Sequence, residues 1–317
     1  MKKILVTGAA GQIGSELTMA LRKRYGNDNV VAGINRTQPG PEVRDSGPIE
    51  TVNCTDIKAI ERVVKKYKTD TIIHLAAILS AVAEAKPALA WDVNINGLYN
   101  VLEVSRENKC TVFTPSSIGA FGLSTPLDNT PQDTIQRPNT MYGVTKVSGE
   151  LLCDYYHKRF GVDTRGVRYP GIISNVTLPG GGTTDYAVEI FYEAIKNKKY
   201  TCYIKKGTFL DMMYMPDAIK ACIDLMEADP AALKHRNAFN VTAMSFDPEI
   251  ITAEIKKHIP EFSMDYDVDP VRQSIAESWP NVMDDSCARE EWGWEPAYDL
   301  PTMTKDMIET LTPKLIT

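Results

Sequence analysis

Apolar runs alternate with helical repeats through the first half of the chain. The stretches KILVTG, VVAGI and TIIHLAA contain few polar residues and are typical of strands. Between them, residues 12–26 and 56–68 place apolar side chains three or four positions apart, as one face of a helix requires. Since strands that are apolar on both faces must be buried on both faces, the alternation predicts a parallel sheet with helices on each side.

This alternation continues to about residue 172 and then weakens. Residues 1–172 are therefore predicted to form a doubly wound parallel sheet in an α/β domain, to which residues 208–242 also contribute. Later segments are shorter and more polar, and they predict a smaller, discontinuous α/β domain over residues 173–317, at the carboxyl edge of the sheet. Residues 37–48 are rich in proline and glycine and predict a long loop.

Composition excludes several classes of protein. Hydrophobic residues make up 43% of the chain and charged residues 24%, which is typical of a globular protein, and the net charge of −6 argues against an extended nucleic-acid surface. No apolar run is long enough to cross a bilayer, and no signal-peptide segment follows the first residues, so a cytoplasmic protein is expected. The six scattered cysteines form no C-x-x-C pair, which predicts free thiols and no metal site.

A glycine-rich turn joins the first strand to the first helix. The stretch VTGAAGQIGSEL places Gly8, Gly11 and Gly14 there, and Gln12 and Ile13 lie between the last two glycines. Glycines at such a junction allow a tight turn, close approach of a pyrophosphate and close packing of helix on strand. We therefore expect a dinucleotide whose pyrophosphate lies at the start of helix 12–26, where free N–H groups favour an anion.

Tyr142 and Lys146 stand four residues apart in MYGVTK, at the start of a predicted helix. Four residues on a helix place a phenol and an ammonium on the same face, one turn apart. Taken alone, this is a surface pair of no consequence. A phenol has a pKa of about 10, however, and a nearby ammonium favours its ionised form, so the same spacing suits a proton-transfer pair.

Together, the G-x-x-G-x-x-G turn, HLAA, NINGLYNVLE, YGVTK, RYPGII and CAREEWGWEP resemble the extended branch of the short-chain dehydrogenase/reductase superfamily. The resemblance implies a Rossmann fold with Tyr142 as the base. It implies that Lys146 lowers the pKa of the phenol and holds the nicotinamide ribose. It also implies a serine that positions the substrate hydroxyl. Ser117, 25 positions before the tyrosine, is the expected residue, and Ser116 is the alternative.

The same resemblance implies NAD as cofactor. It places Leu75, Ala76 and Ala77 beside the adenosine ribose, and Tyr169 and Pro170 beside the nicotinamide carboxamide. The carboxylate that normally follows the second strand and holds the ribose of NAD is missing. Two residues occupy this region instead. Asn35 can hydrogen-bond the ribose, while Arg36 either accepts a 2′-phosphate, which would mean NADP, or is only a solvated charge.

The second half of the chain resembles those superfamily members that oxidise the threonine β-hydroxyl with NAD to give 2-amino-3-oxobutyrate. The stretches LPGGGTTDYAVEIFYEAI, DMMYMPDAI and ESWPNVMDDS carry this resemblance. Thr183 and Thr184 are predicted to meet the carboxylate, or else to cap a helix. Asp185 is predicted to meet the ammonium, or else to favour the helix dipole. Trp279 is predicted to cover the methyl group, or to be interdomain core, and Ser80 is a further polar contact.

Two alternative functions remain open on the same motifs. One is an NDP-sugar epimerase or dehydratase of the same fold, and the other is an inert NAD(H)-binding regulatory protein. For the assembly, the resemblance implies a homodimer through helices 88–108 and 141–161. These helices carry more large apolar residues than one buried face needs, namely Tyr99, Leu102, Leu151, Leu152, Tyr155 and Tyr156.

Overall fold

A six-stranded parallel sheet forms the centre of the protein in the computed structural model, which describes residues 1–176 and 180–316. Its strands, in spatial order, are β3 (Ile49–Thr51), β2 (Val30–Ile34), β1 (Ile4–Thr7), β4 (Thr71–His74), β5 (Thr111–Phe113) and β7 (Thr164–Arg165). The strand order reverses direction at β1, and ligands of such sheets bind outside the carboxyl ends at this point. The predicted doubly wound parallel sheet is confirmed.

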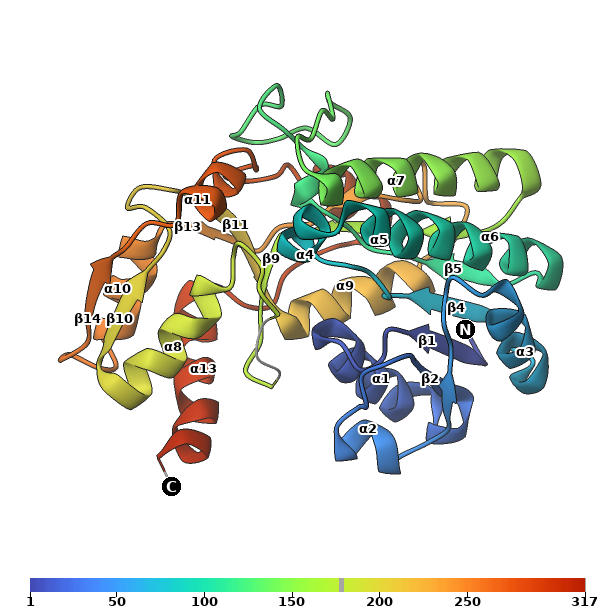
Figure 1. Cartoon of the computed structure of the whole chain (residues 1–317), viewed down its shortest axis with the longest axis horizontal. Coiled ribbons are helices and arrows are strands. Elements are labelled where there is room, and N and C mark those ends of the chain that lie inside the picture. Colours follow the sequence, from blue (N-terminus) through green and yellow to red (C-terminus); the bar gives the residue numbers. More distant parts are fainter. Residues whose placement is uncertain (177–179, 317) are drawn as a thin grey trace.

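Helices cover both faces of this sheet (Figure 1). One face packs on α1 (Gln12–Tyr25) and α9 (Met215–Glu227), and the other on α3 (Ile57–Tyr67), α6 (Gly97–Asn108) and α7 (Met141–Phe160). Alternate residues of β1 divide between the two layers. Ile4 and Val6 pack towards α1, whereas Leu5 packs towards α3 and α6. This double burial explains why β1 and β2 are apolar at almost every position.

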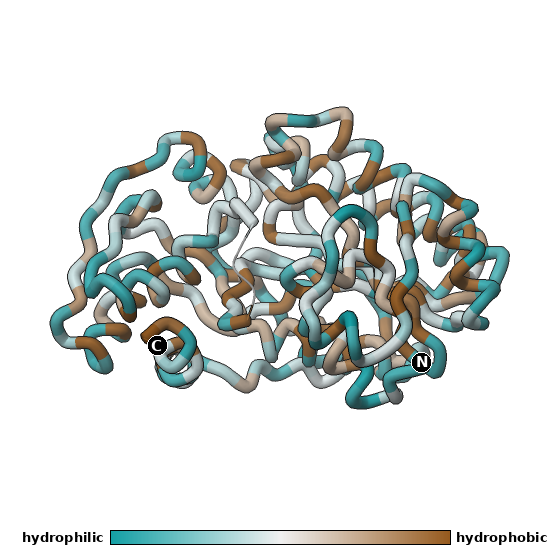
Figure 2. Tube along the Cα trace, turned by 60° about the horizontal axis from the view of Figure 1, so that its bottom comes forward, coloured by the Kyte–Doolittle hydropathy of each residue, from teal (hydrophilic) through white to brown (hydrophobic). Residues whose placement is uncertain are grey.

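The chain then builds a second lobe, which Figures 1 and 2 show beside the first. Each lobe has its own cluster of buried hydrophobic residues. Three small sheets connect or support it. Their strands are β6 (Ser116–Ser117), β8 (Val167–Tyr169) and β12 (Phe239–Asn240); β9 (Gly171–Ile173), β11 (Leu210–Tyr214) and β13 (Met244–Phe246); and β10 (Lys199–Cys202) with β14 (Ser263–Tyr266).

Helices complete this lobe and return to the first. They are α8 (Tyr186–Asn197), α10 (Pro248–Lys256), α11 (Pro270–Ala276), α12 (Ser286–Trp292) and α13 (Leu300–Leu315). Since α9 packs on α1 and Trp294 is buried in the core around β1, the chain passes between the lobes more than once. On this packing we propose the same division as above, residues 1–172 with 208–242 in one domain and the rest of 173–317 in the other.

One local prediction was wrong. Residues 37–48 contain a short helix, α2 (Pro41–Asp45), because the buried guanidinium of Arg22 donates to the carbonyl oxygens of Val30, Val43 and Pro48. The helix expected at 88–108 is present, since residues 87–108 are helical throughout, but its middle is wound as a π-helical turn, Asp92–Asn96, between α5 (Pro87–Trp91) and α6. A separate short helix, α4 (Ser80–Ala85), precedes them.

Helix α8 begins at Tyr186 with Asp185 as its N-cap residue, so Thr183 and Thr184 lie in the turn before it. Leu178 and Pro179, which belong to the stretch that carried the substrate resemblance, lie outside the described residues. Within 1–176 and 180–316, no helix has the length and apolarity that a membrane crossing needs.

Asp211 in β11 provides a test of the second lobe. Its carboxylate is fully buried and accepts hydrogen bonds from the Thr242 hydroxyl and the Met283 N–H, and burial raises its pKa to about 8. A folded pKa above the unfolded value gives stability that is present at low pH and lost as pH rises towards 8. We therefore expect the Tm of Asp211→Asn to fall less between pH 5 and pH 9 than the Tm of the wild type. Each kcal/mol of pH-dependent stability that the substitution removes should reduce this fall by roughly 2–4 °C.

Asp265→Asn is the control for this test, because Asp265 is exposed and pairs only with exposed Lys199. Thermal melts of the wild type and both variants at pH 5, 7 and 9 decide the matter. If Asp211→Asn melts with the same pH dependence as the wild type, Asp211 is ionised in the folded protein near neutral pH.

Candidate active site

A cleft of about 1120 Å³, counted with its solvent-filled mouth, lies at the carboxyl edge of the sheet, between the two lobes. Loops that follow β1, β4, β5 and β8 line one side, and the turn before α8 together with Trp279 lines the other. The predicted site residues in its lining are Gly8, Gly11, Gln12, Ile13, Gly14, Leu75, Ala77, Ser80, Ser117, Tyr142, Lys146, Tyr169, Pro170, Thr183, Thr184, Asp185 and Trp279.

The glycine turn needs its glycines for steric reasons. Gly8 has a φ of +73°, and a Cβ atom there would lie 2.7 Å from the backbone nitrogen of Ala76. A Cβ atom on Gly14 would lie 2.1 Å from the carbonyl oxygen of Gly8. Helix α1 begins directly after this turn, with no side-chain cap and no acidic residue in its first turn. Its amino end is therefore suited to an anion such as a pyrophosphate.

Three of the residues expected to touch the cofactor are not in the lining of this cleft. Ala76 does not line the cleft: its backbone contacts Gly8, and it lines a smaller cavity behind the site. Asn35 and Arg36 are exposed just beyond β2, outside the lining of the cleft. Tyr169 does line the cleft, and its hydroxyl donates to the carbonyl oxygen of Ala218 in α9 at 2.6 Å, which fixes its ring.

Tyr142 and Lys146 occupy the first two turns of α7, which is capped by the Thr140 hydroxyl accepting from the Gly143 N–H at 3.1 Å. The Lys146 ammonium lies 5.3 Å from the centroid of the Tyr142 ring, and it donates to the carbonyl oxygen of Pro115 at 2.8 Å. The four-residue spacing therefore brings the ammonium over the phenol and also ties α7 to the segment that ends in the two serines.

The two candidate serines have different surroundings. The Ser116 hydroxyl donates its proton to the buried carboxylate of Glu150, so it has no proton left to donate to a substrate. The Ser117 oxygen accepts from the Gly119 N–H at 3.1 Å and lines the cleft. A Cβ atom on Gly119 would lie 3.1 Å from the Tyr142 ring and 3.5 Å from the Ser117 oxygen, so the ring and this hydroxyl both lie beside Gly119. Ser117 is therefore the serine suited to meet a substrate.

The expected substrate residues come together on the far wall of the cleft. The Thr184 side chain packs so closely on Gly171 that a Cβ atom there would lie 2.8 Å from the threonine methyl carbon. The alternative of a threonine helix cap is wrong, because α8 has no side-chain cap. Asp185 accepts from the backbone N–H groups of Gly181 and Gly182, and burial raises its pKa. Trp279 lines the cleft and also belongs to the core of the second lobe.

Sequence reasoning missed several residues of the cleft. Leu79, Pro115, Ile118, Gly171, Ile172 and Gly182 also line it, as does Ser116, the alternative serine named above. Each neighbours a predicted residue in the same loop, so the rule that strand ends meet at one edge of the sheet was the available signal. His74 lies behind the cleft. Burial and the charge of Lys146 lower its pKa to about 3, and its Nδ1 is 2.8 Å from the Thr7 hydroxyl, so it is a neutral structural residue.

Comparison with known proteins gives a consistent result. The model of the NAD dependent epimerase/dehydratase family matches residues 4–242. A Staphylococcus saprophyticus protein described as an uncharacterized epimerase/dehydratase is 56% identical over 314 residues, which cover 99% of this chain and 98% of that protein. The X-ray structure of L-threonine dehydrogenase from Clostridium difficile is 63% identical, with a TM-score of 0.98 over 100% of this chain and 99% of that one.

A monomeric L-threonine 3-dehydrogenase from a metagenome, in its apo form, is 45% identical, with a TM-score of 0.94 over 98% of this chain and 99% of that one. The fold, the glycine turn and the Tyr-x-x-x-Lys helix together define the extended class of short-chain dehydrogenases that the sequence predicted. The chain belongs to the NAD dependent epimerase/dehydratase family.

Proposed function

We propose that this protein oxidises the β-hydroxyl of L-threonine with NAD, giving 2-amino-3-oxobutyrate. The proposal rests on the residues that line one cleft. Tyr142, Lys146 and Ser117 line one side of it, and the small polar turn at Thr183–Asp185 lines the other. The likeness to L-threonine dehydrogenases over nearly the whole chain supports the same substrate.

Each residue has a chemical role in this proposal. Ser117 donates a hydrogen bond to the substrate hydroxyl and orients it, and Tyr142 accepts its proton. Lys146 favours the ionised phenol by its charge and binds the nicotinamide ribose. When bound, NAD supplies the acceptor for the hydride that leaves the substrate carbon. The glycine turn and the amino end of α1 bind the pyrophosphate, while Leu75, Ala77, Tyr169 and Pro170 line the rest of the cofactor site.

At the other end of the substrate, Ser80 and the threonines before α8 donate to the carboxylate, and Asp185 accepts from the ammonium. Asp185 already binds two backbone N–H groups through Oδ2, which leaves Oδ1 for this contact. Trp279 covers the methyl group. A small cleft wall built from hydroxyls and one carboxylate suits an amino acid, whose charged ends supply most of its affinity.

The test is NADH formation from a panel of amino acids and UDP-sugars. We expect threonine to be oxidised with a kcat/KM at least tenfold above those of serine and other amino acids. Interconversion of a UDP-sugar without threonine oxidation would establish the epimerase alternative. NADH binding with no turnover of any compound would establish the inert regulatory protein.

For the cofactor, we expect NAD to be preferred to NADP. Arg36 is exposed and lies outside the cleft lining, so Arg36→Ala is expected to change kcat/KM for NAD by less than about twofold. Steady-state kinetics with both cofactors measure this, with Arg62→Ala as a second exposed-arginine control. A preference for NADP that Arg36→Ala abolishes would show that Arg36 binds the 2′-phosphate.

For the assembly, we propose a homodimer with a two-fold axis between α6 and α7. Among the apolar residues that suggested it, Leu102 and Tyr156 are core, but Tyr99, Leu151 and Tyr155 are exposed by 47%, 63% and 54%. We expect sedimentation at micromolar concentration to give a dimer, and Leu151→Glu to give a monomer. Leu123→Glu, at an exposed leucine outside these helices, is the control. A monomeric wild type, as in the metagenomic relative, would refute the dimer.

A further inference from the structure

Glu150 lies on the same face of α7 as Tyr142 and Lys146, because it follows them by eight and four positions. Its carboxylate is 5% exposed and forms a two-pronged ion pair with Arg168, which is equally buried. The Nε of Arg168 is 3.0 Å from one carboxylate oxygen, and Nη2 is 2.8 Å from the other. Neither residue lines the cleft, so neither is explained by the chemistry described above.

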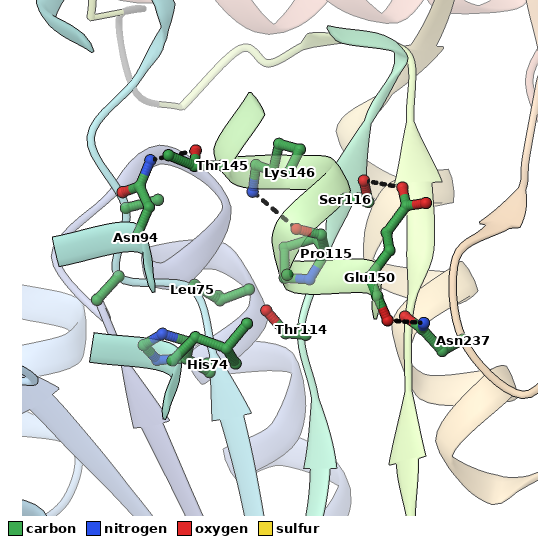
Figure 3. A pocket seen from close by; sticks show the side chains of 14 residues that line it. His74, Leu75, Asn94, Thr114, Pro115, Ser116, Thr145, Lys146, Glu150 and Asn237 are labelled. Atoms are coloured by element: carbon green, nitrogen blue, oxygen red, sulfur yellow. Dashed lines mark hydrogen bonds between the residues drawn. The ribbon is translucent and has the colours of Figure 1, made fainter. Parts of the chain in front are cut away.

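This ion pair joins three elements of the active site. Glu150 belongs to α7, which carries Tyr142 and Lys146. Arg168 belongs to β8, directly before Tyr169 and Pro170. Ser116 belongs to β6, and its hydroxyl donates to the Glu150 carboxylate (Figure 3). Strands β6 and β8 pair so that Ser116 lies opposite Arg168 and Ser117 opposite Tyr169.

All the polar groups of the pair have partners. Gln136 donates to the Glu150 carboxylate at 2.8 Å, and Arg168 Nη1 donates to the Gln132 carbonyl at 2.7 Å and to the Asn240 side chain at 3.1 Å. The guanidinium also lies 5.0 Å from the centroid of the Phe121 ring. A buried ion pair is weak evidence for stability, since apolar residues of similar size often serve as well. The pair instead fixes how α7 and β8 are oriented relative to each other, because a guanidinium and a carboxylate meet in only a few geometries.

A small cavity separates this pair from Lys146. Lys146, Ser116, Glu150 and Asn94 are among the side chains that line it, and Figure 3 shows the ammonium directed towards the Pro115 carbonyl. Segment 115–117 is thus held at two points, by Lys146 at Pro115 and by Glu150 at Ser116. Ser117 is the last residue of this segment, and its side-chain oxygen accepts a hydrogen bond from the Gly119 N–H.

We propose that Glu150 and Arg168, acting through Ser116, form a positioning device that sets the Ser117 hydroxyl at its working distance from Tyr142. The proposal rests on the proposed function, in which Ser117 orients the substrate hydroxyl. Ser116 and Glu150 are positioning residues: the Glu150 carboxylate binds the Ser116 hydroxyl, and the two act on the reaction by fixing where the end of β6 meets α7.

Ser116→Ala tests the link most directly, because it removes one hydroxyl and leaves the ion pair in place. We expect kcat per active site to fall about tenfold, with active sites counted by NADH titration, and the KM for NAD to stay unchanged. The isotope effect on kcat with threonine deuterated at C3 should rise, since hydride transfer becomes slower. Ser116→Thr keeps the hydroxyl and should restore the wild-type rate. Ser105→Ala, at another fully buried serine, should change nothing.

A double-mutant cycle separates positioning from packing. If Ser116 acts through Ser117, then Ser116→Ala should have no further effect on kcat in a Ser117→Ala background. Independent, multiplicative effects of the two substitutions would overturn the proposal, as would a Ser116→Ala enzyme with the wild-type kcat and isotope effect. Absence of threonine oxidation in the wild type is a different result, and it refutes the proposed function itself.

Glu150→Gln extends the test to the ion pair and should lower kcat per site at least as much as Ser116→Ala. The matched control is Asp163→Asn, which removes the carboxylate partner of Arg165, a buried arginine on the neighbouring strand β7. We expect both variants to lose stability but only Glu150→Gln to lose kcat per site. Equal losses of kcat would mean that any disturbed buried arginine slows the enzyme. Should Glu150→Gln fail to fold, the Ser116 series still decides.

Discussion

Tyr142→Phe is expected to lower kcat for threonine oxidation by about a hundredfold or more, because the substitution keeps the ring and removes the oxygen that accepts the substrate proton in the proposed mechanism. NADH binding should persist. The ring packs against Gly119 and lies under the Lys146 ammonium, and phenylalanine preserves both contacts. Single-turnover kinetics and NADH fluorescence titration measure the two effects separately.

Tyr155→Phe is the control for this experiment, since it removes a phenol from an exposed position of the same helix. It should leave kcat unchanged. If Tyr142→Phe also turns over threonine at a near-normal rate, another group is the base and the proposed mechanism is wrong. Lys146→Ala is a less specific variant, because it removes both the charge beside the phenol and the hydrogen bond to Pro115.

The centre of the sheet could be predicted because nearly every residue of β1 and β2 carries the same signal. Ile4, Leu5 and Val6 are all buried, on alternating faces, so the apolar run itself reports a doubly covered strand. Helix α2 and the π-helical turn carried no comparable signal. The first depends on Arg22, whose guanidinium reaches carbonyl groups up to 26 positions away, and such contacts exist only in the folded chain.

The candidate site divides in the same way. The glycine turn and the Tyr-x-x-x-Lys pair are local, since a tight turn and a helical spacing dictate them within seven residues. The choice between Ser116 and Ser117 was not local. It depends on Glu150, 34 positions from Ser116, and on Arg168, 18 positions from Glu150. The family spacing of 25 positions before the tyrosine favours Ser117, and the physical reason is visible only in the fold, where a buried carboxylate binds the Ser116 hydroxyl.

The same reasoning explains why Asp185 was harder to interpret than the threonines before it. A carboxylate next to a glycine-rich turn suits a substrate ammonium, but it also suits the N–H groups of the turn itself. The structure shows that the second contact is made, with Gly181 in a left-handed conformation at φ +96°. The amino acid and the turn therefore share this carboxylate in the proposed complex, and the substrate carboxylate becomes the more decisive end of the molecule.

Thr184→Val is accordingly expected to lower kcat/KM for threonine by roughly ten- to a hundredfold, equivalent to about 1.5–3 kcal/mol for a lost hydrogen bond to a charged group. Valine keeps the shape of the side chain, so its packing on Gly171 survives and only the hydroxyl is removed. The KM for NAD should change little. Thr201→Val, at an exposed position of β10, is the control and should have no effect.

Trp279→Ala should also harm kcat/KM for threonine more than it harms NADH binding, because the indole lines the substrate end of the cleft. Since Trp279 also packs in the core of the second lobe, this variant will lose stability, and its rate must be taken per NADH-binding site. Trp279→Phe keeps part of the packing and should give an intermediate loss. If Thr184→Val and Trp279→Ala both oxidise threonine normally, the substrate binds elsewhere, and the assignment of the turn before α8 to the carboxylate is wrong.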